Sequence, residues 1–169
     1  PRTRLRPHRL SDMAGFAAFF GGARAAYVDP PKNATHLWYG FASEVGSWPL
    51  MGHGGWAIET RDGALAGQVA ITQPPHFPER EIGWIAFDGF EGQGLMREAA
   101  TAALHWAWAQ GWGTLVSYID PGNTRSIALA ERLGARHDPA ALLPTGETAA
   151  ETVVYRHVPD ADGSPEAYA

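Results

Sequence analysis

Residues 87–99 read FDGFEGQGLMREA, and this stretch decides the fold. An apolar segment ends at Phe87, glycines then allow sharp turns of the backbone, and helix-forming residues follow at once. The N–H groups at the start of a helix have no acceptor within the helix, so together with the helix dipole they attract an anion. The positive charge of Arg97 in the first turn would interact unfavourably with that dipole, and a bound phosphate would turn this into a favourable interaction. The stretch predicts a strand, an anion-binding turn and a helix.

Two common phosphate-binding motifs do not fit this turn. The dinucleotide-binding fingerprint needs a third glycine at the position of Arg97, and the surrounding elements are not in β-α-β order. A phosphate-loop NTPase needs Gly-Lys-Ser or Gly-Lys-Thr, which the chain does not contain. Taken alone, the stretch also fits a glycine-rich turn that holds no ligand.

Outward from this turn, apolar periodicity and turn signals predict an α+β fold on a mostly antiparallel sheet. Strands are expected at 1–7, 55–60, 65–72, 81–87, 114–119 and 152–157. Helices are expected at 11–20, with Ser11 as the N-cap, and at 35–47, 99–110 and 123–133. No change of composition marks a linker, so we expect one domain over residues 1–158 and a disordered tail over 159–169.

The composition of the chain argues against several classes of protein. Of its 169 residues, 45% are hydrophobic and 18% are charged, as in an ordinary globular protein. The net charge is −5 and the basic residues are scattered, which disfavours nucleic acid as a partner. No apolar run approaches the ~20 residues of a membrane span, so we expect no membrane partner and a cytoplasmic location. Cysteine is absent and the histidines are dispersed, so we expect no disulfide and no metal.

A second informative stretch, residues 117–135, reads SYIDPGNTRSIALAERLGA. A Gly-x-Gly turn opening a helix, then a strand, then Asn-x-x-Ser opening a helix that ends in Glu-Arg-Leu-Gly, resembles the GNAT superfamily of N-acetyltransferases. Residues 5–12, with Leu-Arg-Pro and Leu-Ser-Asp, and residues 81–84, Glu-Ile-Gly-Trp, are similar to the ribosomal-protein N-terminal (alanine/serine) acetyltransferase branch. The likeness extends from about Thr3 to His157.

The resemblance implies a fold and an activity. The fold would be a mixed, mostly antiparallel central sheet of about six to seven strands with about four helices. The activity would be direct transfer of an acetyl group from acetyl-CoA to a primary amine, on a protein N-terminus or a small molecule. A non-catalytic acyl-CoA sensor or interaction module on the same fold is the alternative. Relatives are often dimers, so a homodimer is an expectation of the likeness alone.

The resemblance also implies how acetyl-CoA would be held. The N–H groups of the glycine turn would bind the pyrophosphate, the strand before it would pair with pantetheine, and Asn123 would contact the pantetheine arm. Asn123 is equally a good helix N-cap after Pro-Gly. Gly89 stands where the family carries Arg or Gln, which removes one phosphate contact. The cofactor-binding residues are expected to be Ile85, Ala86, Phe87, Gly92, Gln93, Gly94, Leu95, Met96, Arg97, Asn123 and Ser126.

The expected chemistry needs a base and an acid. An ammonium group is no nucleophile, so the amine must lose a proton, and Glu81 is the candidate base, acting through water. Ser126 matches the serine of the Asn-x-x-Ser motif and is the candidate proton donor to the leaving thiolate. Many relatives use a tyrosine in this helix, where this chain has Ala130, so Tyr118 is the reserve acid. A solvated glutamate and a first-turn helix serine are the ordinary alternatives for Glu81 and Ser126.

Aromatic residues are candidates for the acceptor site. By the family likeness, Trp38, Trp48 and Trp84 would lie in the acceptor groove between the two early helices and the sheet, with Tyr118 as a further substrate-binding residue. His53, between two glycines, could line the groove or be solvated. Packing in the core is the alternative explanation of the tryptophans.

Overall fold

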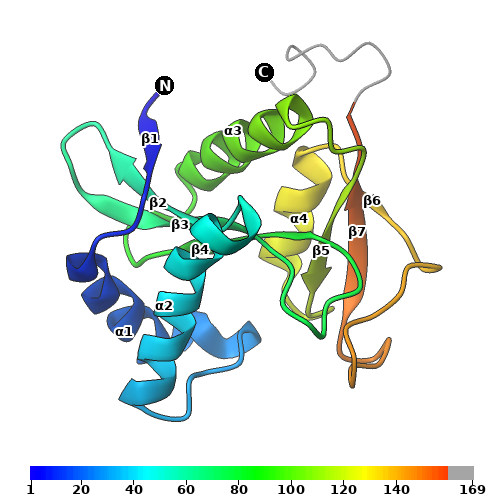
Figure 1. Cartoon of the computed structure of the whole chain (residues 1–169), viewed down its shortest axis with the longest axis horizontal. Helices are drawn as coiled ribbons and strands as arrows, with labels where there is room; N and C mark the ends of the chain where they lie inside the picture. Colours follow the sequence, from blue (N-terminus) through cyan, green and yellow to red (C-terminus); the bar gives the residue numbers. More distant parts are fainter. Residues whose placement is uncertain (160–169) are drawn as a thin grey trace.

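Seven strands form one open sheet in the computed structural model, which describes residues 1–159 (Figure 1). Their order across the sheet is β1-β2-β3-β4-β5-β7-β6. Every neighbouring pair is antiparallel except β4 and β5, which are parallel. The strands are β1 (Thr3–Arg6), β2 (Gly55–Thr60), β3 (Leu65–Thr72), β4 (Glu81–Ala86), β5 (Leu115–Ile119), β6 (Arg136–His137) and β7 (Val153–His157). The predicted tail lies outside the described residues, apart from its first residue.

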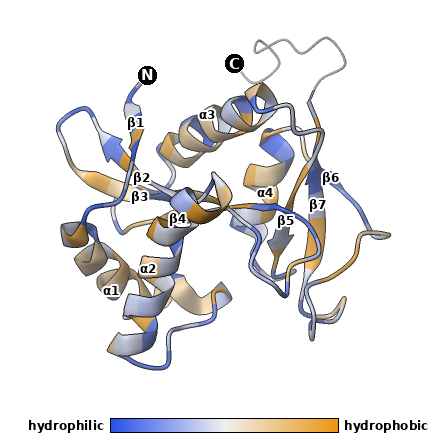
Figure 2. Ribbon diagram, in the orientation of Figure 1, coloured by the Kyte–Doolittle hydropathy of each residue, from blue (hydrophilic) through white to orange (hydrophobic). Residues whose placement is uncertain are grey.

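Within residues 1–159, four α-helices and two short 3₁₀ helices accompany the sheet. They are η1 (Leu10–Asp12), α1 (Met13–Phe20), η2 (Ala23–Tyr27), α2 (Ala34–Met51), α3 (Leu95–Ala109) and α4 (Thr124–Arg132). The predicted fold class, a mostly antiparallel sheet with about four helices, is confirmed. Figure 2 shows hydrophilic residues along the outer loops and apolar residues in the helices and central strands.

The apolar core lies in two main parts. The larger part joins α3 to the central strands and contains Ile58, Val69, Ile82, Leu104 and Leu115, each at most 1% exposed. The second part is aromatic and joins α1, η2 and α2 to the end of β4; its buried members are Phe16, Phe19, Ala25, Phe41 and Phe87. The two early helices therefore pack against the segment that leads into the glycine turn.

The sheet opens between β4 and β5. Among the described residues one pair, Glu81 with Val116, joins these strands, and the Val116 N–H donates to the carbonyl of Arg80 at 3.0 Å. One residue further on, the Ser117 hydroxyl donates to the Ile82 carbonyl at 2.6 Å and so satisfies a backbone group that the parallel ladder leaves unpaired. Beyond this point the strands separate, and the free side of β4 faces the opening.

Several predicted boundaries were wrong, for local reasons. Helix α3 begins at Leu95 rather than 99, directly after the turn. Helix α2 begins after Asn33, which accepts the His36 N–H at 3.0 Å, and continues to Met51 because Pro49 removes only one donor in the last turn. Ser11 is not an N-cap, because a 3₁₀ turn precedes α1. The short elements η2 and β6 were not predicted.

Candidate active site

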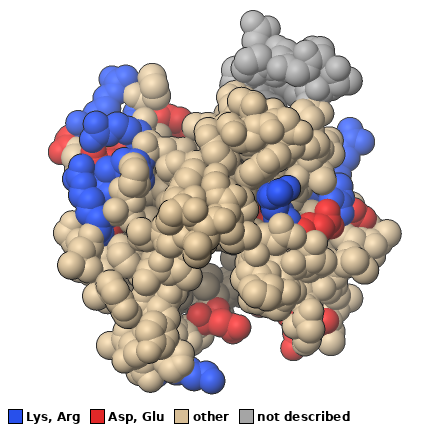
Figure 3. Space-filling model, viewed as in Figure 1, with Lys and Arg blue, Asp and Glu red and all other residues tan. Residues whose placement is uncertain are grey.

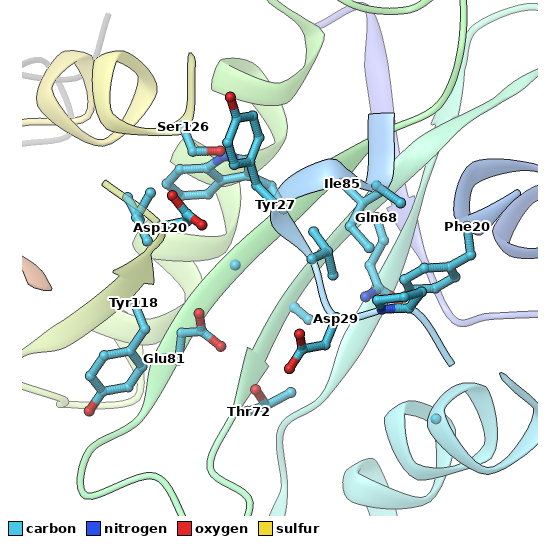
Figure 4. Close-up of a pocket in the computed structure, with 18 of the residues that line it drawn as sticks. Phe20, Tyr27, Asp29, Gln68, Thr72, Glu81, Ile85, Tyr118, Asp120 and Ser126 are labelled. Carbon is cyan, nitrogen blue, oxygen red and sulfur yellow. The ribbon is translucent and has the colours of Figure 1, made fainter. Parts of the chain in front are cut away.

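A pocket of about 1000 Å³ lies at the opening between β4 and β5 (Figure 4). Its wall combines α1, η2 and α2 with strands β3 to β5, the start of α4 and residues 147–152. The space-filling view shows a hollow in this part of the molecule, with acidic atoms on its rim (Figure 3). The predicted site residues that line the pocket are Glu81, Trp84, Ile85, Tyr118, Asn123 and Ser126.

Glu81 is the first residue of β4 and sits where the two parallel strands join. Its carboxyl group points into the pocket (Figure 4). Burial raises its pKa to about 8, the negative charges of Glu44 and Glu147 add to the rise, and a hydrogen bond from the Tyr118 N–H opposes it. A carboxylate with such a pKa can accept a proton from a substrate near neutral pH, which an ordinary glutamate does poorly.

Asn123 and Ser126 lie on the other side of the opening, at the start of α4. The Asn123 side chain accepts the Ser126 N–H at 3.2 Å and caps the helix. This bond orients the first turn, and the Ser126 hydroxyl makes no hydrogen bond within residues 1–159. Ser126 can therefore donate its proton to a group in the pocket.

The Tyr118 hydroxyl is less well placed than that of Ser126. It is buried without a hydrogen-bond partner in the part of the chain that the structure describes, and burial raises its pKa to about 12. The ring packs against Phe77, with 5.0 Å between the ring centroids. In Figure 4 the hydroxyl points away from both Glu81 and Ser126.

The glycine turn presents a set of free N–H groups. Gly92 and Gly94 have φ angles of 71° and 76°, which side-chain-bearing residues rarely adopt. Within residues 1–159, the N–H groups from Gly92 to Arg97 donate to no acceptor, and nothing lies within 4 Å of a Cβ built on Gly92. These open donors at the start of α3 fit an anion such as the pyrophosphate of CoA. The turn does not line the large pocket.

Arg2 is a functional candidate that the sequence reasoning missed. Its guanidinium donates to the Gln93 carbonyl at 2.7 Å and pairs with Glu98 at 3.1 Å. One guanidinium nitrogen lies 3.2 Å from a Cβ built on Gly94, so a cation stands beside the free N–H groups. More than ninety residues separate Arg2 from the turn, and no local pattern reveals this contact.

The free edge of β4 differs by one residue from the expected pantetheine edge. Phe87 donates its N–H to Ala66 of β3 at 3.0 Å, so Phe87 and Ile85 face β3. By alternation, Trp84 and Ala86 turn their backbone groups toward the opening. The Arg24 side chain of η2 donates a hydrogen bond to the Ala86 carbonyl at 3.2 Å and also forms an ion pair with Glu91 at 2.8 Å.

The expected aromatic groove is only partly present. Trp38 is 44% exposed and does not line the pocket. Trp48 packs instead against Trp56 and Trp106, with ring centroids at 4.6 and 5.6 Å. His53 is buried outside the pocket, and its ring nitrogen bonds the Ile71 carbonyl at 2.8 Å. The packing alternative holds for Trp48, because the three indole rings pack against one another.

Residues 1–159 contain no group of three or more His, Cys, Asp or Glu side chains that could hold a metal ion. In the same part of the chain, no helix combines the length and apolar character that crossing a membrane requires.

The open N–H groups at the start of α3 and the pocket between β4 and β5 agree with the resemblance to the GNAT acetyltransferases. A family model described as "Acetyltransferase (GNAT) domain" matches residues 2–136. The chain therefore belongs to the GNAT acetyltransferase family. An acetyltransferase from Agrobacterium tumefaciens is 36% identical, with a TM-score of 0.85 over 92% of this chain and 90% of that one.

More distant proteins share the fold. A putative ribosomal-protein-serine acetyltransferase from Vibrio cholerae is 22% identical, with a TM-score of 0.74 over 94% of each chain. The microcin C7 self-immunity acetyltransferase MccE, solved in complex with acetyl-CoA and AMP, is 17% identical, with a TM-score of 0.69 over 93% of this chain and 92% of that one. Among curated proteins, the uncharacterized YkkB of Bacillus subtilis is 33% identical over 84 residues. That match spans 48% of this chain and 49% of YkkB, about half of each protein.

Proposed function

We propose that this protein is an N-acetyltransferase that transfers an acetyl group directly from acetyl-CoA to a primary amine within a ternary complex. The observation that carries the proposal is Glu81: a carboxyl group with a pKa of about 8, facing the pocket where β4 and β5 separate. The solved relative with bound acetyl-CoA and the match to the family model support the choice of acyl donor.

Acetyl-CoA fits features of two neighbouring elements. Its pyrophosphate suits the free N–H groups from Gly92 to Arg97, with Arg2 adding positive charge. The pantetheine amides suit the unpaired edge of β4 at Trp84 and Ala86. Because the Arg24 side chain donates to the Ala86 carbonyl, it would have to move away when pantetheine binds. Asn123 and Ser126 then lie on the far wall of the opening.

Two side chains, Glu81 and Ser126, carry out the proton transfers of the reaction. Glu81, directly or through one water, takes the proton that the ammonium form of the acceptor must lose before its nitrogen can attack. The C–N bond forms on the acetyl carbonyl, and the C–S bond to CoA breaks. Ser126 donates a proton to the departing thiolate and regains one, through water, from the nitrogen of the new amide, which loses its second proton in this step. Because the chain has no cysteine, no cysteine acyl-enzyme forms on the way.

A non-catalytic acyl-CoA sensor is the second candidate. The open glycine turn would serve a sensor equally well, but a sensor gains nothing from a carboxyl group of raised pKa at the point where the strands separate.

The test is calorimetric titration with acetyl-CoA and with CoA, followed by a thiol-release assay with a panel of primary amines and N-terminal peptides. The proposal expects binding in the micromolar range, thiol release that depends on the amine, and loss of release in Glu81→Gln. Binding without release from any amine would favour the sensor. If neither ligand binds, the proposal is refuted.

A further inference from the structure

A second carboxyl group, that of Glu44 on α2, faces the same pocket as Glu81. Its Oε2 atom is buried and has no hydrogen-bond partner among the described residues. Burial alone raises the pKa of this carboxyl to about 7. A carboxylate that is buried without a hydrogen-bond partner destabilises the fold, so the position of Glu44 is explained by a ligand or by a structural role.

Gln68 of β3 and His8 lie beside Glu44. A Cβ built on Gly55 of β2 would lie 2.9 Å from Glu44 Oε2, 2.9 Å from Gln68 Oε1 and 3.1 Å from His8 Nε2, so these three groups lie close together beside Gly55. Gln68 also lines the pocket, and its oxygen pairs with the His8 ring at 2.7 Å. A carboxylate and an amide oxygen that lie close together in the wall of one pocket are suited to an ammonium group, which has three donors.

The rest of the pocket carries the same sign of charge. No lysine or arginine is among its lining residues. Three of its carboxyl groups have local donors: Asp120 accepts the Gly122 N–H, Glu151 accepts from Thr148, and Glu147 accepts from Thr152. Within residues 1–159, Glu44 Oε2 is the buried carboxyl oxygen for which the structure shows no hydrogen-bond donor. The lining carboxyl groups are Asp29, Glu44, Glu81, Asp120, Glu147 and Glu151.

We propose that Glu44, with Gln68, binds a second ammonium group of the acceptor, so that the substrate is a small linear diamine of which one nitrogen is acetylated. The inference rests on the proposed function and names its substrate class. The reacting nitrogen lies at Glu81, where it gives up its proton, and the other nitrogen stays protonated at Glu44. A monoamine, or a peptide whose only cation is its N-terminus, leaves Glu44 without a partner.

The test compares linear diamines of increasing length with monoamines of the same lengths and with an N-terminal alanine peptide. For the wild-type protein we expect kcat/KM to be about 10- to 100-fold higher for the best diamine than for the matched monoamine, as for a charged hydrogen-bonded pair out of water. In Glu44→Gln this ratio should fall toward one, mainly through a higher KM for the diamine. Glu44→Asp, which restores the charge, should recover part of it.

Glu131→Gln is the matched control. It removes one negative charge from α4 outside the pocket, where Glu131 accepts a hydrogen bond from Tyr155 at 3.3 Å, and it should leave the diamine preference intact. Equal ratios in the wild type and Glu44→Gln, or a peptide that exceeds every diamine, would overturn the inference.

Failure of the inference is distinguishable from failure of the proposed function. If no amine releases thiol, the transfer is refuted, and calorimetric titration of a diamine in the presence of CoA still tests the pocket. Diamine binding that Glu44→Gln abolishes supports the ammonium site. No diamine binding to the wild type overturns it.

Discussion

Replacing Glu81 with glutamine tests the base assignment, because glutamine keeps the shape of the side chain and cannot accept the proton. We expect kcat to fall by about 10²-fold or more at pH 8, the ordinary contribution of a positioned base. The affinity for acetyl-CoA should stay near the wild-type value, since Glu81 lies on the acceptor side of the opening rather than at the glycine turn.

The pH dependence of kcat/KM gives a second quantitative test of Glu81 as the base. With a pKa of about 8, roughly a tenth of the Glu81 carboxyl groups are ionised at pH 7 and about nine tenths at pH 9. The wild-type kcat/KM should therefore rise by about tenfold over these two pH units, in addition to any change due to titration of the free amine. In Glu81→Gln this additional rise should be absent.

The same raised pKa predicts an effect on stability. The folded protein keeps the Glu81 proton between about pH 4.5 and about pH 8, whereas the unfolded chain has lost it, so stability falls as the pH rises through this window. At 1.36 kcal/mol per pKa unit the full shift corresponds to about 5 kcal/mol. Because Glu81 is half-buried and solvent screens part of the effect, we expect roughly 1–2 kcal/mol of extra loss between pH 5 and pH 9 in the wild type relative to Glu81→Gln.

Two assays test whether Glu81 is the base: thiol release at saturating acetyl-CoA across pH 6 to 9.5, and urea unfolding at pH 5 and pH 9. Glu131→Gln serves as the control and should retain both the rise in rate and the loss of stability. If Glu81→Gln keeps full activity, or loses activity with an unchanged pH profile, then Glu81 is not the base.

Three further substitutions test the rest of the site. Gly94→Val places a β-branched residue at a φ of 76°, with its Cβ 3.2 Å from the Arg2 guanidinium. Calorimetric titration should show an acetyl-CoA affinity weaker by about tenfold or more. The control is Gly113→Val, whose Cβ meets nothing within 4 Å and which should bind acetyl-CoA normally. Ser126→Ala should lower kcat with little change in acetyl-CoA affinity, and a normal single-turnover rate would remove the serine from the mechanism. Asn123→Ala removes the helix cap and should cost about 1 kcal/mol in urea unfolding together with some acetyl-CoA affinity; a loss of neither would contradict both roles.

The sequence by itself was sufficient for features that depend on near neighbours in the chain. The glycine turn needs only three glycines and the helix that follows, and the cap of α4 joins Asn123 to Ser126, three residues on. Most strands and helices were predicted for the same reason, since alternation and helical spacing are local signals. Their ends were less accurate, because caps and the last helical turn depend on single contacts such as that of Asn33.

The tertiary structure decided what depends on residues far apart in the chain. Glu81 was a candidate from its position, but its raised pKa comes from burial and from charges on α2 and residue 147. Trp48 joined an aromatic cluster with Trp56 and Trp106 rather than the pocket, a choice that its own helix does not encode. Glu44 met Gln68 beside Gly55 only because α2 packs across the sheet. Spacing along the chain reports local backbone geometry, whereas desolvation and charge at a site depend on everything that the fold packs around it.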